Sequence, residues 1–309
     1  MPFTKADLSM STMWNYRKAQ SGRELLEQLM ALGFQKVELN YQVRPEWLPD
    51  IEKIVRAGIM QVSSVHNVFP KTDDERFSTD SVMLGYEDES LRRQAIELAK
   101  ISIDWAVRLG AGAVVFHPTE VLLPPGDFDV PLKKMIAAHQ TDAGEFRDLQ
   151  KRMFEARQVA PYLDRMMRSI EELANHVEKH ALPVKLGMEN RAMCHQIPIY
   201  PEMELIAERF DGSPAGLWLD TGHGIMMQEM GLQALPLSPV AERNIVGMHI
   251  HDAVDGLDHY APCTLPGSVL APFRKYILQS PIKVLELSGR LSAQEILRGT
   301  NAFVEEYGQ

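Results

Sequence analysis

The sequence contains little of what marks several large classes of protein. Only two of its 309 residues are cysteines, and Cys194 and Cys263 do not form a Cys-x-x-Cys pair, which excludes a disulfide framework. No uncharged apolar run approaches the ~20 residues that a membrane helix needs. Residues 1–18 contain no apolar segment of the kind found in a secretory signal. We therefore expect a protein of the reducing cytoplasm that has no membrane partner.

Positive charge is also scarce. The chain has 32 Lys and Arg against 42 Asp and Glu, so its net charge is 32 − 42 = −10. A broad basic surface for nucleic acid is therefore disfavoured. With 45% hydrophobic and 24% charged residues, the composition is that of a globular chain able to bury a large core.

Short apolar segments alternate with longer amphipathic segments along the whole chain, which predicts parallel strands joined by helices. Eight strand–helix units in 309 residues favour a (β/α)8 TIM barrel that forms one domain over residues 1–309. An open nucleotide-binding sheet is disfavoured because residues 9–14, after the first strand, contain no glycine. The predicted strands are residues 7–12, 36–40, 61–66, 113–117, 184–190, 216–220, 245–251 and 283–287, and the predicted helices are residues 22–32, 45–57, 89–109, 162–180, 202–209, 225–230, 272–279 and 293–307.

One segment departs from this repeat. About forty residues, 118–160, separate the fourth strand from the next helix, whereas such loops usually have 2–6 residues. The segment begins with several prolines and then has a helical pattern over residues 133–158. No linker-like composition bounds it. We therefore predict a long helical insertion after strand 4 that forms an elaborated active-site loop rather than a second domain.

Six consecutive predicted strands end in a histidine or an acidic residue. The carboxyl ends of barrel strands meet at one mouth, so these side chains should converge. Buried carboxylates repel one another unless they are protonated or bind a cation. Together with imidazoles they suit Zn or Mn best, with Co, Fe or Mg as alternatives, and no cysteine is present to make a closed structural zinc site. The six residues are His66, His117, Glu189, Asp220, His249 and Glu286.

These motifs resemble the xylose isomerase-like barrel superfamily, which includes sugar isomerases, epimerases, inosose dehydratases and endonuclease IV-type enzymes. The resemblance implies that Glu189, Asp220, His249 and Glu286 bind one divalent metal, and that Glu189 and Glu286 are the catalytic acid–base pair. The segments that carry it are Met188-Glu189-Asn190, Leu219-Asp220-Thr221-Gly222-His223, His249-Ile250-His251-Asp252 and Leu285-Glu286.

Further histidines resemble the endonuclease IV-type enzymes and are candidates for a second metal or for substrate contacts: His66, His117, His223, His251 and His259. In those enzymes an Asp-x-His pair holds a third zinc. This chain has Leu257 where that aspartate would stand, and Asp255 and Asp258 are out of register. The pattern therefore argues against a third zinc.

The function predicted from these residues is a metal-dependent isomerase or epimerase, or a related dehydratase. Its substrate would be a small sugar, polyol or hydroxy-ketone, with proton transfer through a metal-stabilised ene-diolate. The alternative is a zinc phosphodiesterase of the endonuclease IV type, disfavoured by the acidic loops at residues 73–75 and 252–258. A third possible function is a non-catalytic barrel that binds a ligand through its metal. The protein could also form a homo-oligomer. The candidate substrate-binding residues are Arg191, Trp14, Glu38 and Asn40.

Overall fold

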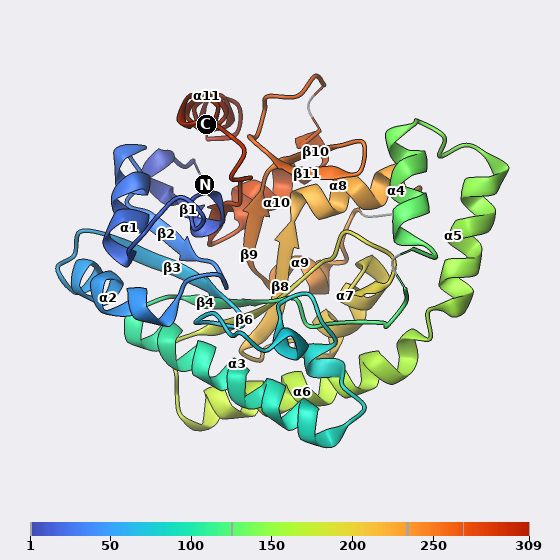
Figure 1. Ribbon diagram of the computed structural model, residues 1–309, viewed down its shortest axis with the longest axis horizontal. Helices are drawn as coiled ribbons and strands as arrows, with labels where there is room; N and C mark the ends of the chain where they lie inside the picture. Colours follow the sequence, from blue (N-terminus) through green and yellow to red (C-terminus); the bar gives the residue numbers. More distant parts are fainter. Residues whose placement is uncertain (1, 125, 233–234, 268, 309) are drawn as a thin grey trace.

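The computed structural model describes residues 2–124, 126–232, 235–267 and 269–308, and it shows a closed barrel of eight parallel strands (Figure 1). The barrel closes where β1 pairs with β12, with Met10 opposite Leu285. In barrel order the strands are β1 (Leu8–Ser11), β2 (Lys36–Leu39), β3 (Gln61–His66), β4 (Ala113–Phe116), β6 (Lys185–Glu189), β8 (Ala215–Asp220), β9 (Ile245–Ile250) and β12 (Lys283–Leu285). All eight predicted strands are confirmed, with bounds that differ by at most two residues.

Helices follow the barrel strands and cover the barrel from outside (Figure 1). They are α1 (Gly22–Ala31), α2 (Leu48–Arg56), α3 (Glu89–Leu109), α6 (Val159–Lys179), α7 (Tyr200–Arg209), α8 (Thr221–Glu229), α9 (Pro239–Arg243), α10 (Arg274–Gln279) and α11 (Ala293–Tyr307). The start predicted for α8 was four residues too late, because Asp220 caps this helix by accepting the His223 N–H at 2.7 Å. The sequence analysis missed α9, which Ser238 caps before Pro239.

Between β4 and α6 the chain forms two helices, α4 (Asp129–Ala137) and α5 (Gly144–Ala156), where the sequence pattern indicated one continuous stretch. They pack around a small apolar cluster of their own that also includes Cys194, after β6, and Met230, at the end of α8. Figure 1 shows the pair beside α8, outside the ring of barrel helices. This packing holds the segment against the loop after β6 and the end of α8.

Two small antiparallel sheets lie outside the barrel: β5 (Thr119–Glu120) pairs with β7 (Gln196–Ile197), and β10 (Asp252–Val254) forms a hairpin with β11 (Leu257–Tyr260). Inside the barrel, Trp218 is fully buried and its ring lies 5.2 Å from that of His249. A Cβ atom at Gly247 would lie 2.2 Å from this indole, so only glycine fits there. Trp218 thus packs directly against a histidine of the candidate site.

No helix among the described residues is both long enough and apolar enough to cross a bilayer.

Candidate metal centre

Four side chains at the carboxyl ends of barrel strands meet in one buried group. Glu189 ends β6, Asp220 ends β8, His249 lies in β9 and Glu286 follows β12. The Nδ1 atom of His249 lies 3.4 Å from Glu189 Oε1, 3.6 Å from Asp220 Oδ2 and 3.2 Å from Glu286 Oε2. We call these residues the four-residue cluster. They could hold a metal ion through one nitrogen and three carboxylates.

Glu189 also belongs to a second group. Its Oε2 atom lies 3.4 Å from His66 Nε2 and 3.2 Å from His117 Nε2. His66 ends β3, and His117 follows β4. Because the two oxygens of Glu189 face different groups, this carboxylate could bridge two metal ions.

A third group lies on the hairpin side of the mouth. Asp258 has one oxygen 3.7 Å from His223 Nε2 and the other 3.5 Å from His259 Nε2. The sequence pattern argued against such a group because Leu257 stands where an aspartate would be needed, and it did not predict that Asp258 would take part. Neighbouring side chains of a strand normally point to opposite faces, but His259 has a left-handed backbone with φ of 61°. This conformation lets Asp258 and His259 face the same group.

Five histidines are fixed in the orientation that metal ligands adopt. Each places one ring nitrogen at hydrogen-bonding distance from an oxygen acceptor and directs the other at the carboxylates of its group. The acceptors are the Asn67 carbonyl for His66 (3.0 Å), Asp80 for His117 (2.8 Å), the Asn190 carbonyl for His223 (2.8 Å), Glu38 for His249 (3.1 Å) and the Glu286 carbonyl for His259 (3.0 Å).

The environment of Glu189 fits a bound cation. Both of its carboxylate oxygens and the Nδ1 atom of His249 are buried and have no hydrogen-bond partner among the described residues. A buried carboxylate without hydrogen bonds is costly, whereas a cation between these atoms would compensate each of them. The donor set of the site therefore fits a divalent metal ion.

The two glutamates of the four-residue cluster differ in their pKa values. Burial alone would raise the pKa of Glu189, but interactions with the neighbouring imidazoles, first those of His117 and His249, outweigh burial and hold this pKa well below its usual value. Burial raises the pKa of Glu286 to about 7. Before a metal binds, Glu189 therefore gives up its proton more readily than Glu286.

His251 was a candidate for a second metal or for substrate, and the structure places it behind Asp220. Its Nδ1 accepts the His259 N–H at 3.0 Å, and its Nε2 lies 2.9 Å from Asp220 Oδ2. Because Nδ1 accepts, Nε2 carries the proton and donates it. Both nitrogens of His251 are therefore engaged in orienting other groups.

The four candidate substrate-binding residues lie in different places. Arg191 lines the cavity above the metal centre and pairs with Asp80 at 2.7 Å. Trp14 lines a neighbouring cavity, where Lys18 Nζ lies 4.1 Å from the centre of its ring. Glu38 and Asn40 are buried and line neither cavity. Glu38 instead accepts from His249, so it acts on the site through that ring.

Sequence reasoning missed Asp80, Tyr41 and Lys133 and set Asp258 aside as out of register, yet all four line the cavity above the metal centre. Asp80 lies in the long loop between β3 and α3, far from any strand end. Lys133 comes from α4 and so connects the segment after β4 to the site. This cavity has a volume of about 250 Å³, and Glu286, His117 and His223 also line it.

Comparisons with known proteins agree with this architecture. No curated protein sequence matches the chain at a significant level. A D-tagatose 3-epimerase-like protein has a similar structure, with a TM-score of 0.63 and 14% identity over 97% of this chain and 98% of the other.

Two further solved structures are similar. The 3-keto-D-glucoside 4-epimerase YcjR from E. coli has a TM-score of 0.61 and 14% identity over 98% of this chain and 100% of the other. Endonuclease IV from Thermus thermophilus has a TM-score of 0.57 and 16% identity over 98% of this chain and 100% of the other. At these identities the likeness shows the fold. The family model of the xylose isomerase-like TIM barrel matches residues 26–277, and the chain belongs to that family.

Proposed function

We propose that the protein is a divalent-metal-dependent isomerase or epimerase acting on a small sugar, polyol or hydroxy-ketone. The observation that carries this proposal is the four-residue cluster at the floor of a cavity of about 250 Å³. This volume is smaller than that of typical drug-binding pockets and suits a small polar molecule. Solved relatives of the same fold include several sugar epimerases.

Glu189, Asp220, His249 and Glu286 would hold a metal, with Zn and Mn as the favoured ions. With a metal bound there, the carbonyl of a hydroxy-ketone would be polarised and the adjacent C–H bond acidified. Glu286, which lines the cavity, would take this proton, and Glu189, the other glutamate of the four-residue cluster, would complete the acid–base pair. Return of a proton to the opposite face gives epimerisation, and return to the neighbouring carbon gives isomerisation.

Arg191 and Lys133 complete the polar lining of the cavity. Arg191 is fixed by Asp80, so its remaining N–H groups can donate to substrate hydroxyls. Lys133 comes from the segment over residues 118–160, which we propose to be an active-site insertion within a single domain.

The test is proton exchange with solvent. The metal-loaded protein is incubated in D2O with a panel of ketopentoses, ketohexoses and inososes, and NMR follows deuterium at the carbon next to the carbonyl. We expect incorporation for at least one substrate, reduced at least 100-fold in Glu286→Gln and unchanged in Glu208→Gln, whose carboxylate is exposed on α7. Exchange that persists in Glu286→Gln would refute the assigned role.

A second candidate function is hydrolysis of a phosphoester. The groups formed by His66, His117 and Glu189 and by His223, Asp258 and His259 favour it, because clusters of metal ions stabilise both oxygens of a displacement at phosphorus. The test uses bis(p-nitrophenyl) phosphate and a duplex with one abasic site. Cleavage of either, without any deuterium exchange, would favour this function over the first.

A further inference from the structure

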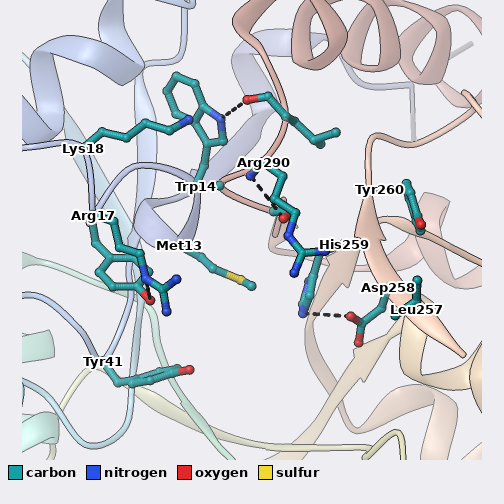
Figure 2. Close-up of a pocket in the computed structure, with 14 residues that line it drawn as sticks. Met13, Trp14, Arg17, Lys18, Tyr41, Leu257, Asp258, His259, Tyr260 and Arg290 are labelled. Atoms are coloured by element: carbon teal, nitrogen blue, oxygen red, sulfur yellow. Dashed lines mark hydrogen bonds and ion pairs between the residues drawn. The ribbon is translucent and has the colours of Figure 1, made fainter. Parts of the chain in front are cut away.

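A second cavity opens beside the metal centre. It has a volume of about 580 Å³ and lies between the loop after β1, the loop after β12 and the β10–β11 hairpin (Figure 2). It shares lining residues with the cavity above the metal centre, so the two are contiguous. The shared residues are Met13, Tyr41, Leu257, Asp258 and His259.

The charge of this second cavity is opposite to that of the whole chain. Arg17, Lys18 and Arg290 line it, and Asp258 is the one carboxylate among its described lining residues. Asp258 faces His223 and His259, so its charge is directed at the metal centre. A chain with a net charge of −10 thus places three cations around one hollow next to its candidate site.

None of the three cations forms an ion pair with a carboxylate within the described parts of the chain. Arg17 donates to Tyr16 Oη at 2.7 Å and lies over the same ring. Lys18 lies over the ring of Trp14, and the indole is fixed by its N–H bond to the Leu291 carbonyl at 2.9 Å. Figure 2 shows the Arg290 side chain extending into the hollow toward His259, with Arg17 and Lys18 on the opposite wall.

The position of one of these cations, Arg290, matches a common property of this architecture, whereas Arg17 and Lys18 follow the first strand, β1. TIM barrels frequently bind phosphate with the loops that follow their last two strands. Here β12 is the eighth barrel strand, and Ser288, Gly289 and Arg290 follow it at the cavity wall. A phosphate group carries close to two charges near neutral pH and can accept hydrogen bonds from several such donors at once.

We propose that this cationic cavity binds the phosphate group of a phosphorylated sugar while the hydroxy-ketone end of the same molecule reaches the metal centre. This inference rests on the proposed function and narrows its substrate class to sugar phosphates. Arg290 and Lys18 supply the main charge to the phosphate, and Arg17 adds to it from the same wall as Lys18.

The test is calorimetric titration of the metal-loaded protein with D-ribulose 5-phosphate and with D-ribulose. We expect the phosphate ester to bind at least tenfold more tightly than the neutral sugar. Arg290→Ala and Lys18→Ala should each weaken binding of the ester about tenfold and leave binding of D-ribulose unchanged. Lys179→Ala, an exposed cation at the end of α6, is the matched control and should change neither.

Each other result has a definite meaning. Equal affinity for the two sugars, or an ester affinity that Arg290→Ala and Lys18→Ala leave intact, would overturn the inference even where deuterium exchange supports the proposed function. Tighter binding of the abasic duplex than of the ester, lost in the same two variants, would overturn it in favour of nucleic acid. If no substrate exchanges deuterium, yet inorganic phosphate binds and both variants abolish this binding, the proposed function fails while the phosphate site stands.

Discussion

Glu38 offers a sharp test of the metal centre. It lines neither cavity, and it acts on the metal centre through the imidazole ring of His249. Both of its carboxylate oxygens lie 3.1 Å from Nε2 of His249, and both side chains are fully buried. Removing the carboxylate that supports a metal-binding histidine typically lowers metal affinity 10–100-fold. This corresponds to about 1.4–2.7 kcal/mol. Since water cannot reach this pair to replace the carboxylate, we expect Glu38→Gln to lie within that range.

The assay is competition between the protein and a chelating dye for Zn or Mn, at constant pH and ionic strength. Glu38→Gln keeps the volume of the side chain, so folding should be little disturbed. The matched control is Glu52→Gln, which removes a surface carboxylate that binds Arg108 far from the site. A Glu38→Gln protein that binds every metal equivalent as tightly as the wild type would refute the role of Glu38 and weaken the assignment of His249 as a ligand.

Three other predictions test separate parts of the site. Asp80→Asn should lower metal affinity of the His66–His117–Glu189 group about tenfold, seen as one weakened equivalent in the same dye competition, because Asp80 orients His117. Burial lowers the pKa of His223, but the charges of Asp220 and Glu189 raise it to about 9, so a metal that binds His223 must displace its proton. The metal affinity measured by dye competition should therefore rise with pH up to about 9. A metal affinity that does not depend on pH would contradict this. Removing the metal with a chelator should lower the Tm measured by calorimetry by about 4 °C. Metal at 100 times its Kd stabilises the fold by about 2.7 kcal/mol, and 309 residues give an unfolding entropy of about 0.65 kcal/mol/K. An unchanged Tm would contradict metal binding by the folded protein.

The alternation of strands and helices predicted the barrel, because each strand can be recognised in the sequence from its apolar run and the glycine or proline that flanks it. The same logic predicted Glu189, Asp220 and Glu286, which stand where a strand ends and the mouth begins. Helix α8 was placed too late because its start depends on the side chain of Asp220, which serves as a cap as well as a member of the site.

The parts of the site that lie in loops could not be predicted from periodicity. Asp80 reaches His117 from a loop whose path is fixed only by tertiary packing. Asp258 appeared out of register because the left-handed backbone at His259 leaves no trace in the pattern of residue types. Glu38 is a polar residue near the end of a strand, as a residue lining the pocket would also be. Only the structure shows that it lies behind His249.

The central claim is that the buried carboxylates and the histidine of the four-residue cluster hold a divalent metal ion. The most direct measurement is metal content per chain, by mass spectrometry of protein purified without chelator and of protein reconstituted with Zn or Mn. We predict at least one equivalent in the wild type, held by the four-residue cluster, and less bound metal in Glu189→Gln, because this residue belongs to that cluster. Wild-type protein that holds no metal after reconstitution would contradict the account.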